Sequence, residues 1–212
     1  MDAGDARAHD FIVARLLEAR PTDSVLSEEG RDPKDRLDAA RVWIVDPLDG
    51  TNEYGEPGRR DWAVHVALVM GGQPVAGAVA LPACELTFAT RPAPVVPPRA
   101  AGRRLRIVAS RSRPPYASIV LAEALDADIA PLGSAGAKAM AVVTGEADVY
   151  AHSGGQYEWD SAAPVAVAAA AGLHVSRLDG SPLVYNRPDP WLPDLLICRA
   201  ELATPALEAL WG

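Results

Sequence analysis

One short segment constrains the fold most: an apolar run that ends in a pair of aspartates. Residues 41–45 (Arg-Val-Trp-Ile-Val) predict a buried strand, because they are mostly β-branched or aromatic and turn residues follow directly. Residues 46–51 read Asp-Pro-Leu-Asp-Gly-Thr, in which the proline fixes φ and the glycine permits an unusual backbone angle. Asp46 and Asp49 lie three residues apart across this turn, so both carboxylates can project to the same side.

These residue types suit a hard cation such as Mg²⁺, which prefers oxygen ligands in near-octahedral geometry. Asp46 and Asp49 would supply carboxylates and Leu48 a carbonyl, while the amides of Gly50 and Thr51 would face a phosphate oxygen. The alternative is an ordinary surface turn, since Asp-Gly is among the commonest turn dipeptides. The apolar strand in front of the turn favours the metal site.

Two further carboxylates occupy comparable positions. Glu28 follows the apolar pair Val25-Leu26, although with Glu29 it could equally form a solvated charge pair. Asp160 stands at the start of an Ala-rich helix expected over 160–171, where Asp is also a favoured N-cap. An N-cap and a metal ligand do not exclude each other.

Composition restricts the class of protein. The 212 residues suffice for one domain or two small ones, and 49% hydrophobic residues provide a core. The net charge of −8, with no basic cluster beyond residues 103–106, argues against a nucleic acid polymer or an anionic membrane as partner. The two cysteines, Cys84 and Cys198, lie far apart, and no apolar run approaches a membrane span. Since the N-terminus does not read as a signal peptide either, we expect a cytoplasmic protein.

The Pro-rich stretch 91–102 divides the chain into an α+β domain, 1–102, and an α/β domain, 103–212. In the first, the pattern predicts a helix over 6–20 and an antiparallel meander of strands 62–70, 74–81 and 86–89. In the second, we expect strands 105–109, 148–151 and 194–199 between helices 116–125, 133–145 and 160–171.

Three motifs, in this order, carry a resemblance that covers nearly the whole chain. They are Ser-Glu-Glu at 27–29, Trp-Ile-Val-Asp-Pro-Leu-Asp-Gly-Thr at 43–51 and Trp-Asp-Ser-Ala-Ala at 159–163. Together they resemble the inositol monophosphatase superfamily of lithium-sensitive, magnesium-dependent phosphatases. The segments 110–112, 133–138 and 182–186, with Glu158, are most similar to its 3′(2′),5′-bisphosphate nucleotidase (CysQ) branch, of the actinobacterial type. This implies a layered α-β-α-β-α sandwich of the sugar-phosphatase type, here without the usual N-terminal helix.

The resemblance also implies the metal ligands. Glu28, Asp46 and the Leu48 carbonyl would hold one Mg²⁺, and Asp46, Asp49 and Asp160 a second. A weaker third ion would lie near Glu28. Direct in-line attack of a metal-activated water on phosphorus is the mechanism expected of such a centre.

Further roles follow from the same resemblance. Thr51 and Asp5 would orient the attacking water, which makes Thr51, Asp5 and Glu28 the catalytic set. Asp5 stands so near the first residue that we expect it to fray. The substrate would be bound by Gly50, Thr51, Ser110, Arg111, Ser134, Lys138 and Glu158.

Several of the substrate residues have plainer interpretations. Lys138 near a helix N-terminus opposes the helix dipole, which the second phosphate of a nucleotide would relieve, but a snorkelling surface lysine is equally compatible. Arg111 and Arg113 could belong to a surface loop. His152 and Gln156 could line the substrate pocket on a flexible loop around Gly154-Gly155. The tryptophans Trp62, Trp191 and Trp211 fit a core or an interface better than a base-stacking platform.

We therefore expect a phosphomonoesterase that hydrolyses 3′-phosphoadenosine 5′-phosphate to AMP and phosphate. The alternatives are an inositol-1-phosphate or broad sugar-phosphate phosphatase, and a weakly active nucleotide- or phosphate-binding protein. Apolar surface left open by a missing helix would favour a homodimer.

Overall fold

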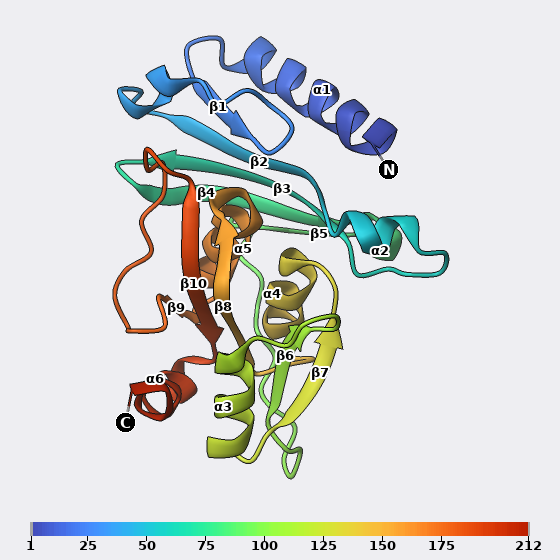
Figure 1. Cartoon of the computed structure of the whole chain (residues 1–212), viewed down its shortest axis with the longest axis vertical. Helices are drawn as coiled ribbons and strands as arrows, with labels where there is room; N and C mark the ends of the chain where they lie inside the picture. The colour runs from blue at the N-terminus through green and yellow to red at the C-terminus, as the bar shows by residue number, and fades with distance from the viewer. Residues whose placement is uncertain (1, 212) are drawn as a thin grey trace.

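Two five-stranded sheets form the framework of the chain, seen here in a computed structural model that describes residues 2–211. The first sheet has the order β1-β2-β3-β4-β5 and the second the order β7-β6-β8-β10-β9. Helices cover both outer faces and fill the space between the sheets (Figure 1). The layers alternate as α-β-α-β-α, which confirms the predicted sandwich.

The first sheet follows the chain from strand to strand. β1 and β2 are parallel, and the other neighbours are antiparallel. The meander predicted for residues 62–89 is confirmed, and side chains of β3 alternate between buried and partly exposed as the period of two requires. The strands are β1 (Ser24–Ser27), β2 (Val42–Asp49), β3 (Ala63–Met70), β4 (Gln73–Leu81) and β5 (Leu86–Ala89).

The second sheet mixes parallel and antiparallel pairs. β6 pairs in parallel with both β7 and β8, whereas β10 pairs antiparallel with both β8 and β9. The strands are β6 (Arg106–Ser110), β7 (Asp128–Leu132), β8 (Val149–Tyr157), β9 (His174–Ser176) and β10 (Trp191–Cys198).

The helices supply the other three layers (Figure 1). α1 (Asp2–Ala19) lies on the outer face of the first sheet, α4 (Ala135–Val143) and α5 (Glu158–Ala170) lie between the sheets, and α3 (Tyr116–Ala124) and α6 (Ala203–Trp211) lie on the outer side of the second sheet. A short helix, α2 (Thr51–Gly55), follows β2 directly. Three 3₁₀ turns complete the elements, at Lys34–Leu37, Pro82–Cys84 and Ala200–Leu202.

Three details differ from the sequence prediction. The first helix starts at Asp2 rather than residue 6, so Asp5 lies within α1 and is buried; the expectation that it frays is wrong. Gly154 and Gly155 belong to β8, not to a flexible loop, because β8 continues to Tyr157 beside β10. The elements β1, α2, β7 and β9 were not predicted, because segments of three to five residues carry little periodicity; α6 was not predicted either.

The main hydrophobic core lies between the two sheets. It takes residues from both sides of the Pro-rich stretch 91–102, including Ile44 and Val79 from the first half and Met140, Val167 and Ile197 from the second. The division into two domains at residue 102 stays a prediction.

On the face opposite α5, the first sheet carries a shallow apolar hollow of about 390 Å³. Trp43, Val66 and Val75 contribute to it, and Val75 is 52% exposed.

None of the helices in residues 2–211 combines the length and the apolar character needed to cross a bilayer.

Candidate active site

Three carboxylates from two layers meet in the interior. Asp46 and Asp49 come from the end of β2, and Asp160 comes from the first turn of α5. One oxygen of each lies within 4.8 Å of the others. Residues i and i+3 of a regular strand face opposite sides, but the β2–β3 register shifts between Asp46 and Asp49, which brings both carboxylates to one side. The predicted convergence is confirmed, although the aspartates lie within the strand rather than in a turn after it.

The backbone around Asp49 is shaped by local hydrogen bonds. The Leu48 amide donates to Asp46 Oδ1 at 3.0 Å, and the Thr51 hydroxyl approaches the Leu48 carbonyl at 3.4 Å. Gly50 has φ 88°, and a Cβ there would lie 2.9 Å from the Cβ of Ser134. Both the left-handed backbone and the close approach require glycine, so the unusual backbone angle predicted at Gly50 is confirmed, while its role in binding phosphate stays a prediction.

Asp49 is held by the amino end of α4. The amides of Ala135 and Gly136 donate to its two oxygens at 3.1 and 2.6 Å. Burial by itself raises the pKa of Asp49, but His65, Lys138 and the Gly136 amide outweigh burial and leave that pKa lowered. Asp49 is therefore kept as a carboxylate inside the protein.

His65 is the residue that the sequence analysis missed. Its Nε2 lies 3.2 Å from Asp49 Oδ2, and its Nδ1 lies 3.0 Å from the Trp159 carbonyl oxygen. Burial lowers the pKa of His65, yet its bonds to Asp49 and to Trp159 raise it overall. The available signal was its place in β3: it shares the buried face with Ala63 and Ala67, where an unpaired polar side chain is costly.

The pKa values of Asp46 and Asp160 are raised, in contrast to that of Asp49. Asp46 Oδ2 is buried without a hydrogen-bond partner, and burial, followed by Asp49 and Glu28, raises its pKa well above the usual range. Burial and then Asp49 raise the pKa of Asp160 to about 7. The Tyr157 amide donates to Asp160 Oδ2 at 2.6 Å. Tyr157 is the N-cap of α5, so the alternative assignment of Asp160 as the N-cap is wrong.

This donor set fits hard divalent cations. Buried carboxylates that raise one another's pKa are stabilised by a cation between them, and the unpartnered Asp46 oxygen is a free ligand atom. Mg²⁺ prefers carboxylate, carbonyl and water oxygens, which is what these elements offer.

Glu28 and Asp5 lie at the rim of the same centre. The Glu28 amide donates to the Val45 carbonyl at 3.2 Å, which fixes Glu28 directly beside β2. Removal of its carboxyl from water, then Glu29, Asp49 and Asp5, raise the pKa of Glu28, while a hydrogen bond with Asp46 opposes the shift. Among the described residues, the carboxylate group within 4.8 Å is limited to the three aspartates, so metal binding by Glu28 stays a prediction.

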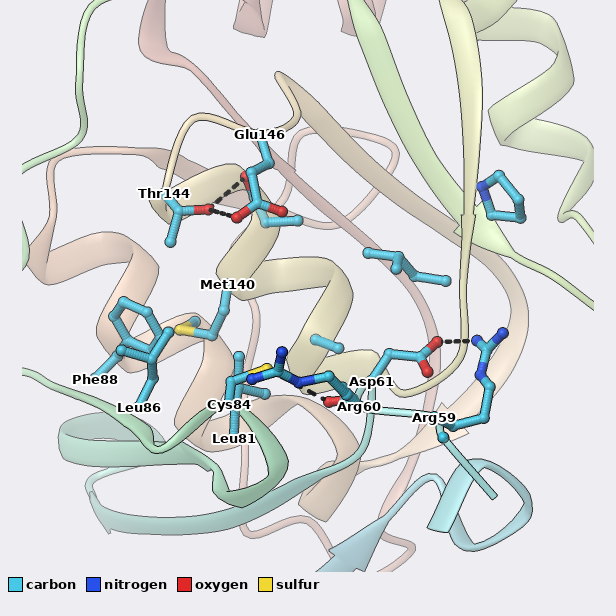
Figure 2. Close-up of a pocket in the computed structure, with 15 residues that line it drawn as sticks. Arg59, Arg60, Asp61, Leu81, Cys84, Leu86, Phe88, Met140, Thr144 and Glu146 are labelled. Carbon is cyan, nitrogen blue, oxygen red and sulfur yellow. Dashed lines mark hydrogen bonds and ion pairs between the residues drawn. The ribbon is translucent and has the colours of Figure 1, made fainter. Parts of the chain in front are cut away.

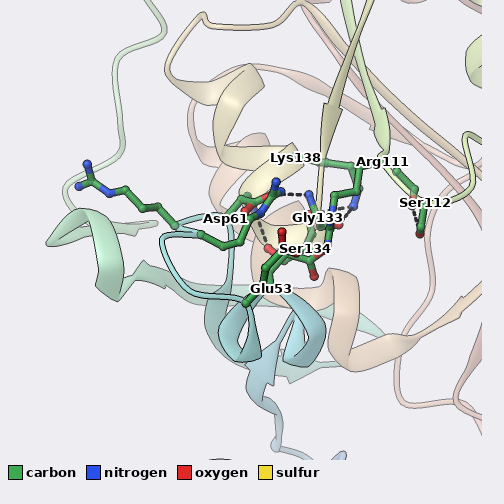
Figure 3. Close-up of polar contacts among 12 residues, drawn as sticks. Glu53, Asp61, Arg111, Ser112, Gly133, Ser134 and Lys138 are labelled. Atoms are coloured by element: carbon green, nitrogen blue, oxygen red, sulfur yellow. Dashed lines mark hydrogen bonds and ion pairs between the residues drawn. The ribbon is translucent and has the colours of Figure 1, made fainter. Parts of the chain in front are cut away.

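Arg111 and Lys138, two of the residues expected to bind substrate, are both engaged by other groups of the protein (Figure 3). Arg111 donates to Glu53 Oε1 at 2.8 Å and to Glu56 Oε2 at 2.6 Å, so α2 engages its guanidinium. Lys138 is buried and donates to the carbonyls of Gly133 and Ser134. The interpretation of Lys138 as a surface lysine is therefore wrong, and burial lowers its pKa.

Two more of these residues have structural partners. The Ser134 hydroxyl caps α4 by accepting from the Ala137 amide at 2.9 Å. Glu158 is fully buried, and its two oxygens accept from the amides of Asn186 and Arg187 at 2.7 and 2.9 Å. Substrate binding by Glu158 stays a prediction that these contacts do not support.

A cavity of about 550 Å³ opens between the segment after β6 and the middle of β8. Ser110, Arg113, Tyr116, His152 and Gly155 are among its lining residues. Arg113 and His152 thus face an open space, as a pocket role requires. Gln156 is buried and does not line this cavity.

The three tryptophans considered as core residues differ in their settings. Trp211 is 70% exposed and Trp191 is 41% exposed, so neither belongs to the core. Trp191 packs edge-on to Tyr157, whose ring stacks on Trp159 with 4.6 Å between centroids. Trp62 is half-buried against Tyr54.

Comparison with known proteins agrees with this site. The model of the inositol monophosphatase family matches residues 2–210. A 3′-phosphoadenosine 5′-phosphate phosphatase of Mycobacterium bovis is 51% identical over 99% of this chain and 81% of its own. The 3′(2′),5′-bisphosphate nucleotidase CysQ of Escherichia coli K12 is 34% identical over 87% of this chain and 78% of its own.

Solved structures agree as well. CysQ from Bacteroides thetaiotaomicron, described as a bacterial member of the inositol monophosphatase family, superposes with a TM-score of 0.80 at 29% identity. That match covers 92% of this chain and 83% of the other. With the carboxylate centre, the layered fold and a family match over almost the whole sequence, the chain belongs to the inositol monophosphatase family.

Proposed function

We propose that the chain is a Mg²⁺-dependent phosphomonoesterase that hydrolyses 3′-phosphoadenosine 5′-phosphate to AMP and phosphate. The observation that carries the reaction type is the set of two buried carboxylates, Asp46 and Asp49, and the partly buried Asp160, whose oxygens lie within 4.8 Å of one another. The substrate is supported by the relative that is 51% identical and named 3′-phosphoadenosine 5′-phosphate phosphatase.

In this proposal Glu28, Asp46 and the Leu48 carbonyl hold one Mg²⁺, and Asp46, Asp49 and Asp160 hold another. When bound, the cations would lower the pKa of the attacking water and screen the charge of the phosphate oxygens. The chain's own groups fix the ligands: α4 amides and His65 orient Asp49, and the Tyr157 amide orients Asp160. A third cation near Glu28 belongs to the same proposal.

Thr51 and Asp5 hold the attacking water in this scheme. The Thr51 hydroxyl already lies next to the Leu48 carbonyl, at the junction of β2 and α2. Asp5 is buried in α1, and its charge contributes to the raised pKa of Glu28, which supports a position close enough for this role. A water held between these residues could pass its proton to a carboxylate.

The cavity of about 550 Å³ would receive the nucleoside and its second phosphate. Its size falls within the range of about 300–1,000 Å³ typical of small-molecule sites. Arg113 and Ser110 offer anion-binding groups there, and Tyr116 offers an aromatic face. β8 forms one wall of this cavity and continues directly into α5, which carries Asp160. The wall of the cavity is therefore connected to the metal centre by only a few residues of the chain.

The test is phosphate release from 3′-phosphoadenosine 5′-phosphate and from inositol 1-phosphate, each with and without Mg²⁺. We expect release that requires Mg²⁺ and favours the nucleotide, and Asp46→Asn should abolish it. Equal release by Asp46→Asn and the native chain would contradict the enzyme assignment. That outcome would instead favour a weakly active nucleotide- or phosphate-binding protein.

One observation favours a second candidate, an inositol-1-phosphate or sugar-phosphate phosphatase. Arg111 is engaged by Glu53 and Glu56, and Lys138 by two carbonyls, which leaves fewer cations for a second phosphate. Arg113→Ala discriminates, because Arg113 lines the cavity proposed for the second phosphate: it should slow turnover of the bisphosphate nucleotide far more than turnover of inositol 1-phosphate. Faster native turnover of inositol 1-phosphate would establish the second candidate.

We further propose a cytoplasmic enzyme that dimerises through the apolar hollow on the first sheet. Val75 lines this hollow together with Trp43 and Val66. It is 52% exposed and is the most accessible side chain of the three. Light scattering on the native chain and Val75→Lys would test this: the native chain should have twice the monomer mass, and the variant should be monomeric. A native monomer would contradict it.

A further inference from the structure

A second cavity, of about 440 Å³, borders α4 (Figure 2). Ala137, Met140, Ala141 and Thr144 line it at the i, i+3, i+4, i+7 spacing of a single helix face. The opposite wall comes from the 3₁₀ turn Pro82–Cys84 and from β5. None of the carboxylates of the metal centre lines this space, and it shares no lining residue with the cavity near His152.

The cavity combines an apolar floor with a cation. Leu86, Phe88 and Met140 gather at one end of the cavity (Figure 2). The apolar side chain of Leu86 is nevertheless 48% exposed. Arg60 is exposed, and its Nε donates to the Ala83 carbonyl at 2.9 Å, which holds the guanidinium at the cavity. Within residues 2–211 its terminal nitrogens have no side-chain partner, whereas the neighbouring Arg59 is paired with Asp61.

We propose that this cavity is an effector site for a small amphipathic anion. The apolar body of the ligand packs against Leu86, Phe88 and Met140, and its carboxylate, sulfonate or phosphate pairs with Arg60. A guanidinium with free N–H groups at the edge of an apolar pocket suits this chemistry, because the apolar contacts supply affinity and the charge supplies orientation.

The position of the cavity links it to the metal centre. Asp61 lies on its wall, accepts from the Gly133 amide at 2.6 Å through Oδ2, and accepts from the Ser134 amide at 3.1 Å through its carbonyl. These two residues lead into α4, whose first amides hold Asp49. A ligand that packs against Asp61 and α4 therefore acts on the element that orients a metal ligand.

The binding test uses 8-anilinonaphthalene-1-sulfonate, which has an aromatic body and one sulfonate, followed by its fluorescence. We expect saturable 1:1 binding to the native chain and at least tenfold weaker binding to Arg60→Gln. Arg99→Gln removes another exposed arginine, whose side chain donates to the Arg103 carbonyl, and should bind like the native chain. Equal affinity of Arg60→Gln and native protein overturns the proposal.

Cys84 provides a second readout that needs no variant. It lines the cavity and is half-buried, whereas Cys198, the other cysteine, is fully buried. Monobromobimane should therefore label Cys84 alone, as peptide mass spectrometry can verify. Saturating anilinonaphthalene sulfonate should slow this labelling at least fivefold, and an unchanged labelling rate overturns the site.

The effector role rests on the proposed function and has its own test. Saturating anilinonaphthalene sulfonate should change the turnover of 3′-phosphoadenosine 5′-phosphate at least twofold in the native chain but not in Arg60→Gln. An unchanged native rate overturns the effector role. A native chain without any turnover overturns the proposed function instead, while the binding and labelling results still decide whether the site exists.

Discussion

The Nε2 atom of His65 lies 3.2 Å from Asp49 Oδ2, while its Nδ1 lies 3.0 Å from the Trp159 carbonyl. One imidazole on β3 thus joins the end of β2 to the first turn of α5, the two elements that carry the aspartates. Its contacts with Asp49 and with the residue before Asp160 make it a positioning residue for both.

We expect His65→Leu to weaken Mg²⁺ activation about 10- to 100-fold, as loss of a partner to a metal ligand usually does. His65→Gln, whose amide can replace Nε2–H, should retain more affinity. The measurement is the Mg²⁺ concentration for half-maximal phosphate release. His174→Gln alters a histidine that is bonded to the Ser176 hydroxyl, and its Mg²⁺ activation should match that of the native chain. Native-like Mg²⁺ activation of His65→Leu would contradict the positioning role.

Gly136 is expected to resist substitution because it lies against this histidine. A Cβ at Gly136 would be 2.2 Å from His65 Nε2 and 2.9 Å from the Ala63 Cβ. Gly136→Ala should lower the free energy of unfolding by about 1–3 kcal/mol, as overpacking does, and should also weaken Mg²⁺ activation. Urea denaturation measures the first effect.

The matched control is Gly4→Ala, another helical glycine. Its nearest neighbour is the mobile end of the Tyr54 side chain at 3.3 Å, and alanine favours helix by up to about 1 kcal/mol. If both variants changed stability equally, the contact with His65 would not be the cause.

Removing one carboxylate should stabilise the metal-free protein. Asp46, Asp49 and Asp160 repel one another at close range in a buried place, so Asp160→Asn relieves repulsion when no cation is bound. We expect a higher Tm than native in EDTA, and little or no further increase on adding Mg²⁺. The native chain should show the opposite: a lower Tm in EDTA and a clear rise with Mg²⁺.

Asp128→Asn serves as the control for that experiment, since Asp128 is exposed and paired with Arg104. Its Tm should follow the native chain in both buffers. A Tm of Asp160→Asn that rises with Mg²⁺ as much as the native Tm would exclude Asp160 as a ligand.

The acid sensitivity of the fold should depend in part on Asp32. Its carboxylate is bonded at 2.6 Å to the Nε of Arg36, which is fully buried and also bonds to Asn186 and Arg187. Hydrogen bonding to Arg36 lowers the pKa of Asp32 to about 2. Since a lowered carboxyl pKa contributes stability above its unfolded value, this contribution should be present above about pH 4 and be lost as pH falls towards 2.

Asp32→Asn should therefore cost about 1–2 kcal/mol at pH 7, with allowance for the solvent that still reaches Asp32. The difference from the native chain should shrink steadily between pH 4 and pH 2. Urea denaturation at several pH values measures it, with Asp10→Asn, at an exposed position of α1, as the control. A difference independent of pH would contradict the pairing.

Much of the fold was accessible from sequence because its signals are local. The alternation in β3 and the apolar run of β2 each reflect one buried face, and the order of motifs indicated the layered sandwich. The length of β8 was not accessible, because two glycines suggest a loop, whereas pairing with β10 on both sides of them carries the strand through a register shift. Tertiary hydrogen bonds decided that element.

The three aspartates of the candidate site could be predicted, but the residues that support them could not. Asp46, Asp49 and Asp160 could be recognised from motifs, whereas His65 is a single polar residue whose partner lies across the sheet. Arg111 shows the converse: its charge suggested an anion site, but Glu53 of α2 and the C-cap residue Glu56, which bind it, could not be located before the fold was known. Long-range pairing of charges leaves no local pattern.

The wide separation of the aspartates in the sequence has a consequence for synthesis. A nascent chain that has just emerged through β5 holds Asp46 and Asp49 on one sheet, but neither the α4 amides nor Asp160 yet exists outside the ribosome. The three aspartates can therefore meet only after α5 has been synthesised. In the proposed metal site, competence to bind cations thus arises late in synthesis, once α5 has emerged.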